Sequence, residues 1–246
     1  MKEYIYSRNA VYETLRAKRR QVFSIEMAEG VQEKGRIEDI LKLAQGQKIK
    51  VQRAPRAKLD RINQNHQGVV AEVDGYPYSD VIEILERAGE EPPFVLILDS
   101  LQDPQNFGTL LRTAEAAGVH GLIIPLARTV QVTPAVVNAS SGASEHMLIA
   151  RSNLSQAIEA LRENDVWIAG LDRQGTEIGV DSRHLKGALG LVVGAEGEGL
   201  HELTQKKCDV VLRLPMKGRI ESLNAAVAGS IVVYLAYLAR AQLHTA

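Results

Sequence analysis

Residues 94–112, FVLILDSLQDPQNFGTLLR, contain the pattern on which the fold of this chain depends. An apolar run is followed by an acidic residue, a polar turn and then a stretch with helical spacing from about Phe107. A continuous apolar run of this length is typical of a strand buried on both faces, as in a parallel sheet. The stretch therefore predicts a strand ending at Asp99 and a helix with Asn106 near its start and Arg112 about one and a half turns further on.

The same alternation of apolar runs and helical patterns continues along the chain. Further short apolar runs lie at 121–125, 147–151, 166–171, 189–194 and 210–215. Such runs predict a parallel sheet covered by helices on both faces. In an open sheet of this kind, ligands bind beyond the carboxyl ends of the strands, so Asn106 and Arg112 are expected to face a site there.

A smaller α/β pattern occupies the first 75 residues. Helices are expected at 8–18, at 36–44 and just after Pro55, and strands at 22–27, 49–54 and 68–73. Residues 76–92 combine turn signals at both ends with one amphipathic acidic stretch and are expected to form a linker helix. The sequence thus predicts an α/β protein with a small domain over 1–75 and a larger domain over 93–246.

Composition narrows the class of protein. The chain has 246 residues, 45% of them hydrophobic, which supports packed cores rather than disorder. A single cysteine, Cys208, cannot form an intramolecular disulfide, and the N-terminus has no targeting pattern, so a cytoplasmic protein is expected. Residues 222–239 carry no charge but are only mildly apolar. We therefore expect a helix buried between domains or subunits there, and no membrane span.

Charge is distributed unevenly along the chain. Residues 1–75 contain 15 Lys and Arg against 10 Asp and Glu, whereas 76–246 contain 14 against 20. The basic residues of the first part form two clusters: Arg16, Lys18, Arg19 and Arg20, then Lys48, Lys50, Arg53, Arg56, Lys58 and Arg61. Such clusters are either a solvated face or a surface that binds phosphates. The six histidines are scattered and none is spaced with Cys208 as a metal ligand would be, so no metal site is expected.

Two further blocks combine glycine with polar side chains: GAEGEG at 194–199 and LPMKGRIESLN at 214–224. The first joins a buried strand to a helical pattern, but its glycines do not follow the Gly-x-Gly-x-x-Gly order of dinucleotide folds, so a nicotinamide or flavin enzyme fits poorly. The second leads from a strand into the uncharged helix, whose first backbone amides are free to hold a polar or anionic group. Both blocks are expected to share one site with residues 106–112.

The three blocks, NFGTLLR at 106–112, GAEGEG and LPMKGRIESLN, together resemble the motifs of the SpoU/TrmH family of S-adenosylmethionine-dependent RNA ribose 2'-O-methyltransferases. The resemblance covers roughly residues 92–246 and, more loosely, the whole chain. It implies a SPOUT-type methyltransferase domain with a C-terminal trefoil knot, a homodimer, and an N-terminal RNA-binding domain similar to a ribosomal protein. It also favours the phosphate-binding interpretation of the basic clusters.

Within the family, the chain is most similar to enzymes that methylate a guanosine of 23S ribosomal RNA. A tRNA guanosine 2'-O-methyltransferase and a resistance-type rRNA 2'-O-methyltransferase share the same motifs and remain alternatives. A non-catalytic RNA-binding protein is the alternative from a different class.

The resemblance also assigns the site residues. The positions that line the S-adenosylmethionine pocket in the family are Gly194, Leu214 and Leu223. The candidate catalytic residues are Arg112, Asn106, Glu196, Ser222 and Asn224, and Ala226 stands where many relatives have a second serine. The family's proposed base is the arginine of the first motif, but a guanidinium is almost never deprotonated in proteins. We therefore expect Arg112 to hold an RNA phosphate and stabilise the emerging alkoxide, with the other four orienting the groups that react.

Overall fold

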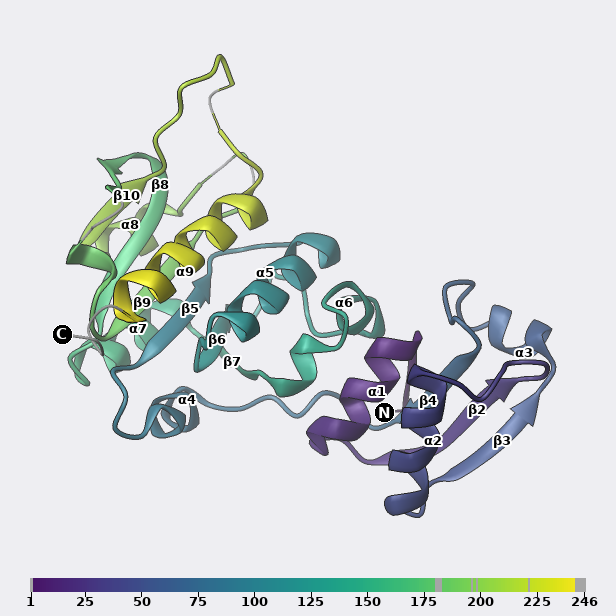
Figure 1. The fold of residues 1–246 in the computed structure, drawn as a ribbon. Helices are drawn as coiled ribbons and strands as arrows, with labels where there is room; N and C mark the ends of the chain where they lie inside the picture. The colour runs from purple at the N-terminus through teal and green to yellow at the C-terminus, as the bar shows by residue number, and fades with distance from the viewer. Residues whose placement is uncertain (1, 180–182, 196, 198, 221, 242–246) are drawn as a thin grey trace. The chain divides into compact units, whose positions relative to one another are not determined.

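The computed structural model describes residues 2–179, 183–195, 197, 199–220 and 222–241 (Figure 1). The chain forms two compact units. Unit 1 comprises Met1–Pro77 and Gln131–His146, and unit 2 comprises Tyr78–Val130 and Met147–Ala246. The units therefore differ from the continuous ranges expected from the sequence, because residues 131–146 lie between two strands of the larger sheet in the chain but pack in unit 1.

Unit 1 contains a four-stranded sheet with the order β1-β4-β2-β3. Its strands are β1 (Glu3–Tyr6), β2 (Val22–Ala28), β3 (Lys50–Ala54) and β4 (Val69–Val73). Strand β4 is antiparallel to β1 and β2, and β2 is parallel to β3. The carboxyl ends of β1, β2 and β3 consequently lie at one edge of the sheet, where β4 begins. All the expected strands are present, and β1 is an addition that the sequence pattern did not predict.

Helices cover both faces of this sheet. They are α1 (Arg8–Ala17), α2 (Arg36–Gly46), α3 (Arg56–Asp60), α6 (Pro134–Ala139) and the 3-10 helix η1 (Ala143–His146). On one face, Leu59 of α3 packs against Tyr6 and Val70. The opposite face carries Ile5 and its fully buried register neighbours, as the two-residue period of a strand requires. Helices α1 and α2 lie beside each other with their apolar stripes buried.

Unit 2 is built on a six-stranded sheet with the order β10-β8-β9-β5-β6-β7, and every strand pairing in it is parallel. The strands are β5 (Phe94–Leu98), β6 (Gly121–Pro125), β7 (Leu148–Ser152), β8 (Trp167–Glu177), β9 (Leu189–Val193) and β10 (Val210–Arg213). These are the six runs that the sequence predicted, so the parallel α/β sheet is confirmed. The trefoil knot remains an expectation that follows from the resemblance.

Two layers of helices enclose this sheet. They are α4 (Val81–Ala88), α5 (Pro104–Ala116), α7 (Leu154–Arg162), α8 (Glu202–Lys206) and α9 (Ala225–Ala241), with the short 3-10 helix η2 (Arg183–Leu185). Ile84 of α4 and Ile158 of α7 belong to one buried cluster with Val95 and Ile97 of β5. The stretch expected to be a linker helix is therefore packed into the core of unit 2.

On the other face, α5 and α9 lie side by side (Figure 1). Their close approach depends on Gly229, where an added Cβ would lie 2.8 Å from Leu110 and 3.1 Å from Val193. Helix α9 contains most of the uncharged stretch 222–239 and extends past it to include Arg240. Among the described residues, no helix is both long enough and apolar enough to cross a bilayer.

The strand order determines where a ligand can bind. Strand β9 lies between β5 and β8, although both of those strands precede it in the chain. At such a point, where the order of strands reverses, the loops at the carboxyl ends diverge and leave a crevice. The loops that follow β8, β9 and β10 are expected to line it.

Candidate active site

A pocket of about 890 Å³, including its open mouth, lies at the carboxyl ends of β9 and β10 beside the start of α9. Its lining residues are Leu171, Asp172, Arg173, Val193, Gly194, Ala195, Gly197, Gly199, Arg213, Leu214, Met216, Ser222, Leu223, Ala225 and Ala228. The structure thus brings together all three expected cofactor residues and one expected catalytic residue, Ser222, in one pocket.

The loop after β9 folds back on itself at Gly194. Ala195 and Gly199 exchange two backbone hydrogen bonds of 3.1 Å each. A Cβ on Gly194 would lie 2.2 Å from the carbonyl oxygen of Gly199, so no other residue type fits there without moving the loop. The main chain itself therefore forms this wall of the pocket. Glu196, expected to be catalytic, lies outside the described residues.

Two aspartates hold the end of this loop, one within β8 and one directly after β5. Asp172 accepts a hydrogen bond from the backbone N–H of Leu200 at 3.2 Å. Asp99, which is 4% exposed, accepts from the backbone N–H of His201 at 3.0 Å, and its other oxygen lies 3.0 Å from Nδ1 of that histidine. Charged acceptors make stronger hydrogen bonds than neutral ones, so this anchoring fixes the loop firmly.

The sequence analysis did not identify either aspartate as a site residue. A usable signal existed for Asp99, because it ends an apolar strand at the edge of the sheet where ligands bind. Asp172 gives no such signal, since it lies within β8, in the stretch where the pairing of β8 with β10 is interrupted.

The third block supplies the start of α9. Asn224 caps this helix, because its Oδ1 accepts from the backbone N–H groups of Ala226 and Val227 at 3.0 and 3.2 Å. Its Nδ2 donates to Oδ1 of Asn106 at 3.1 Å. The two asparagines expected to be catalytic therefore meet and join α9 to the first turn of α5. Ala226 itself is 1% exposed, so a serine at this position would have a buried hydroxyl.

Arg112 lies elsewhere on the same pair of helices. It is exposed and is not part of the lining of the pocket described above. It lines a separate shallow depression with Thr113, Ala116, Ser230, Ile231 and Tyr234. The hydroxyls of Thr113 and Ser230 lie 3.0 Å apart, which fixes α5 against α9 beside this arginine. Of the candidate catalytic residues that are described, Ser222 lines the pocket, whereas Arg112, Asn106 and Asn224 do not.

The chemistry available in the pocket is restricted. Burial raises the pKa of the Cys208 thiol to about 12, so this residue is not a nucleophile at neutral pH. Within the described residues no group of three or more His, Cys, Asp or Glu is placed to hold a metal ion. Arg173 and Arg213 add positive charge to a lining that is otherwise largely apolar, and Arg213 is paired with Glu177 at 3.0 Å.

The basic clusters of the N-terminal region are not all available to bind phosphates. The side chain of Arg20 is fully buried, and it pairs with Glu3 at 2.7 Å and Glu145 at 3.0 Å. Arg19 donates to the hydroxyl of Tyr76 at 3.1 Å and to the carbonyl of Pro77 at 3.0 Å. The expectation that Arg20 meets phosphate is therefore wrong, because sequence spacing did not reveal its buried carboxylate partners.

Two protein-family models match the chain, one in each half. Residues 93–234 match the model described as the SpoU rRNA Methylase family. Residues 4–79 match the model described as RNA 2'-O ribose methyltransferase substrate binding. Together these two models cover most of the chain.

Curated relatives match over nearly the whole length. YacO of Bacillus subtilis (strain 168), assigned to the TrmH family of tRNA/rRNA methyltransferases, is 42% identical over 244 residues, with 97% of this chain and 96% of the relative covered. A protein of Staphylococcus aureus (strain COL) with the same family assignment is 43% identical over 212 residues, covering 84% of each chain.

Solved structures show the same fold. The SpoU methyltransferase AviRb from Streptomyces viridochromogenes, in complex with AdoMet, has a TM-score of 0.80 at 22% identity, with 100% of this chain and 92% of that chain covered. An AdoMet-bound rRNA methyltransferase from Sinorhizobium meliloti has a TM-score of 0.78 at 23% identity, with 96% and 86% covered. At these identities the likeness concerns the fold alone.

Proposed function

Since this chain belongs to the SpoU/TrmH family of RNA methyltransferases, we propose that it transfers a methyl group from S-adenosylmethionine to the ribose 2'-hydroxyl of a guanosine in 23S ribosomal RNA. This is the activity of the RlmB methylases within the family. The general activity follows from membership of the family: the chain is an S-adenosylmethionine-dependent RNA 2'-O-ribose methyltransferase. The identity of the RNA and of the nucleotide is the part that we propose.

The observation that carries the proposal is the pocket formed by the second and third sequence blocks. Gly194 and Leu223 are 29 positions apart in the chain, yet both line it, together with Leu214 and Ser222. The apolar lining and the main chain of Gly194 beside it fit a ligand that has both an apolar and a polar part. When bound, S-adenosylmethionine supplies an electrophilic methyl group at its sulfonium. In our proposal Gly194, Leu214 and Leu223 hold this donor.

The remaining candidate residues act on the acceptor in our proposal. Four residues orient the ribose hydroxyl: Ser222 in the lining of the pocket, Asn106, Asn224 and Glu196. Arg112 holds a phosphate of the RNA and stabilises the negative charge that develops on the 2'-oxygen. This role suits a permanently charged planar cation and does not require that it lose a proton.

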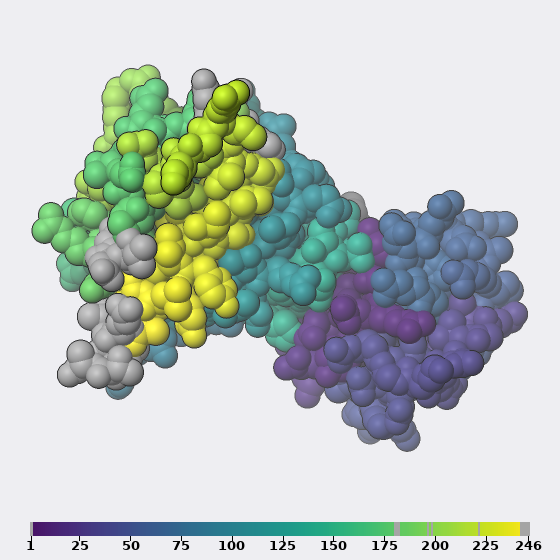
Figure 2. Space-filling model, turned by 45° about the horizontal axis from the view of Figure 1, so that its top comes forward, coloured from purple at the N-terminus to yellow at the C-terminus, as the bar shows by residue number. Residues whose placement is uncertain are grey.

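We further propose that the active protein is a homodimer. Helix α9 lies open across the surface of unit 2 (Figure 2) and exposes large apolar side chains: Val227, Ile231, Tyr234, Tyr237 and Leu238. An apolar patch of this kind on a water-soluble surface marks an interaction site. Arg112 lies at the edge of the same patch. A second copy that covered α9 would therefore also enclose this arginine.

The assembly proposal has a direct test. Light scattering should give about twice the chain mass of 26.9 kDa at micromolar concentration. Replacement of Ile231 and Tyr234 by Glu should lower the measured mass to that of one chain, because buried charges without partners are costly. A wild-type monomer would contradict the proposal.

The substrate is tested by nucleoside mass spectrometry. Ribosomal and transfer RNA from cells with and without the gene are digested, and 2'-O-methylguanosine is compared in each fraction. If cells without the gene lose 2'-O-methylguanosine from 23S RNA alone, the proposal is supported. If they lose it from tRNA, the chain is a tRNA methyltransferase instead. A resistance-type enzyme would change antibiotic susceptibility along with 23S methylation. A chain that binds RNA but transfers no methyl group would be a non-catalytic RNA-binding protein. The proposed compartment is the cytoplasm, where these RNA substrates are found.

A further inference from the structure

One edge of unit 1 collects exposed basic and amide side chains. We define the carboxyl edge of unit 1 as the exposed residues that follow β1, β2 and β3 or precede β4: Arg8, Lys34, Arg56, Arg61, Gln64 and Asn65. These residues share one edge because β1, β2 and β3 run in the same direction and β4 begins where they end. Beneath this edge, the buried side chains of Leu59 and Tyr6 pack together and support it from inside.

The positive charge at the carboxyl edge is largely uncompensated. Two acidic side chains nearby are paired with other cations, Glu33 with Arg53 and Glu26 with Lys58, and a third, Asp60, is hydrogen-bonded to His66. Within the part of the chain that the structure describes, Arg8, Lys34, Arg56 and Arg61 form no ion pair with a carboxylate. Glu29 is also exposed there. The edge therefore keeps a net positive field that attracts anions.

The side-chain amides of Gln64 and Asn65 belong to the loop between α3 and β4, which is held in place by hydrogen bonds. His66 is fully buried, its Nδ1 accepts from the backbone N–H of Gly68 at 2.8 Å, and its Nε2 lies 3.0 Å from Oδ1 of Asp60. Asn63 accepts from the backbone N–H of Asn65 at 2.8 Å. A loop fixed in this way loses little conformational entropy when a ligand binds to its exposed side chains.

The same loop contains a strained residue. Gln67 has φ of 52°, a left-handed conformation that residues other than glycine rarely adopt. Its carbonyl accepts from Nε of Arg8 at 3.1 Å, and its Oε1 accepts from the backbone N–H of Arg8 at 3.2 Å. These contacts orient Arg8 and maintain the strained conformation. Strain of this kind is concentrated at functional sites.

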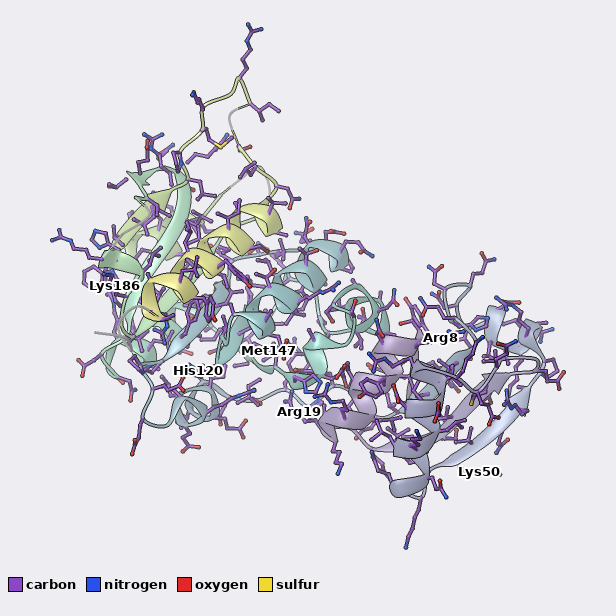
Figure 3. The ribbon with its side chains drawn as sticks, viewed as in Figure 1. Arg8, Arg19, Lys50, His120, Met147 and Lys186 are labelled. Carbon is purple, nitrogen blue, oxygen red and sulfur yellow. The ribbon has the colours of Figure 1, made fainter. Side chains whose placement is uncertain are left out.

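The opposite end of the sheet differs in its arginines, because Arg16 pairs with Glu13 and the side chain of Arg20 is buried. Figure 3 shows Arg8 and Lys50 at opposite ends of unit 1. The exposed residues there are Lys48 and Lys50 with Gln21 and Gln45, whereas the amide of Gln47 donates to the carbonyl of Leu15 at 2.9 Å. Lysine side chains act as point charges and do not distinguish one base from another.

We propose that the carboxyl edge of unit 1 binds an unpaired segment of RNA, such as a loop or a bulge. The guanidinium groups of Arg8, Arg56 and Arg61 contact phosphates, and the amides of Gln64 and Asn65 contact base edges. Unpaired bases present these edges, whereas a paired A-form helix hides them in its deep groove. Planar guanidinium groups match phosphate, and amides supply both a donor and an acceptor. This inference rests on the proposed function, which makes RNA the substrate.

The test compares two double variants of the full-length protein that change the charge equally at opposite ends of β3. The probes are an RNA hairpin with a large single-stranded loop and a fully paired RNA of the same length. R56E/R61E should weaken hairpin binding on the order of tenfold or more and lower the salt slope by about 0.7 for each phosphate that the protein no longer neutralises. K48E/K50E should cause a several-fold smaller loss. Equal losses in the two variants would overturn the inference.

A second variant separates base recognition from charge. Q64A/N65A should remove the preference for the hairpin over the duplex while the salt slope stays unchanged, because no charge is altered. Wild-type protein that binds both probes equally would overturn the inference. Melting temperature and donor affinity are measured for each variant to confirm folding. Wild-type protein that methylates no RNA would refute the proposed function, whereas active protein whose RNA affinity is unaffected in R56E/R61E would refute this inference alone.

Discussion

Gly194 shows how one backbone position determines a binding site. The residue joins a buried strand to a loop that returns against it, so the space where a side chain would begin is occupied by the backbone of Gly199. The hydrogen bonds of Asp99 and Asp172 to the end of this loop prevent it from moving away. Glycine is therefore required here by the tertiary packing.

We predict that Gly194→Ala is enough to abolish donor binding. The added Cβ would have to displace backbone atoms, which opens the Ala195–Gly199 pairing and changes the wall of the pocket. Isothermal titration calorimetry with S-adenosylmethionine should detect at least a tenfold loss, equivalent to about 1.4 kcal/mol. Gly46→Ala is the matched control, because open space surrounds that position. Unchanged donor affinity in Gly194→Ala would place the pocket elsewhere.

Arg112 should be separable from donor binding. Because it does not line the donor pocket, Arg112→Ala is expected to keep donor affinity and to lose methyl transfer on the order of a hundredfold, as removal of transition-state charge stabilisation predicts. Arg112→Lys should restore little methyl transfer, since an ammonium group cannot reproduce the two parallel hydrogen bonds that a planar guanidinium donates to phosphate. Single-turnover assays at saturating RNA measure the effect. Arg173→Ala provides the contrast, because that residue lines the pocket and its loss should weaken donor binding. Normal turnover in Arg112→Ala would exclude this arginine from catalysis.

At the scale of elements, the pair of helices α5 and α9 connects the first and third sequence blocks. Asn106 meets Asn224 at their first turns, Thr113 meets Ser230 further along, and Gly229 allows the helices to approach. The two blocks are more than a hundred residues apart in the chain. Any substitution that shifts α5 against α9 is therefore expected to move the mouth of the pocket.

The 3-10 helix η1 is held in unit 1 by a buried ion pair. Glu145 is 1% exposed and pairs with Arg20 at 3.0 Å. Burial raises the pKa of Glu145, although the Arg20 guanidinium acts in the opposite direction. Because the pKa is higher in the folded state, the stability gained from protonation is present below the ordinary pKa of 4.5 and is lost as the pH rises through the folded value.

We predict that Arg20→Ala lowers the free energy of unfolding by about 3–5 kcal/mol at neutral pH, because it leaves a buried carboxylate without its partner. The loss should become smaller below pH 4.5, where Glu145 is uncharged in both states. Urea denaturation at neutral and acid pH gives both values. Arg16→Ala removes an exposed ion pair with Glu13 and should cost less than about 1 kcal/mol. An equal decrease in the free energy of unfolding for the two variants would show that the buried ion pair stabilises the fold no more than the exposed one.

At the scale of the whole molecule, the chain passes between its two units three times. The pocket lies wholly in unit 2, and the carboxyl edge lies wholly in unit 1. Residues 131–146 belong to unit 1 although they follow β6 of unit 2 in the chain. Gly142 lies against α1 so closely that an added Cβ would be 2.5 Å from Cβ of Glu13. Removal of the first 77 residues would therefore uncover this segment.

We predict that the fragment 78–246 binds S-adenosylmethionine but loses RNA affinity, and that residues 131–146 become accessible to protease. A fragment that begins at Glu90 should be less stable, because it lacks α4, whose Ile84 is fully buried and fits over Gly121. Removal of a buried isoleucine side chain alone costs about 2–5 kcal/mol. Thermal unfolding and limited proteolysis compare the two fragments with the full chain. Full RNA affinity in fragment 78–246 would contradict the role given to unit 1.

Much of the molecule could be predicted from local patterns. The apolar runs at 94–98 and 189–193 were predicted to be strands of a parallel sheet, because continuous burial on both faces is typical of such strands, and their pairing with each other was not predicted. The three blocks predicted the pocket residues Gly194, Leu214 and Leu223 through resemblance to a family. The paired Asn106 and Asn224 were named as well, but their contact with each other was not foreseen.

Local patterns and motifs in the sequence predicted the α/β class, the six strands of the parallel sheet and four residues that line the pocket: Gly194, Leu214, Ser222 and Leu223. These properties depend on hydrophobic periods and on motif residues that are close together in the chain. The tertiary structure alone decided that Arg20 is buried, that residues 131–146 pack in unit 1, that Asp99 and Asp172 hold the loop after β9, and that Arg112 lies outside the pocket. Each of these depends on a contact between residues far apart in the chain, which no local pattern of polarity can specify.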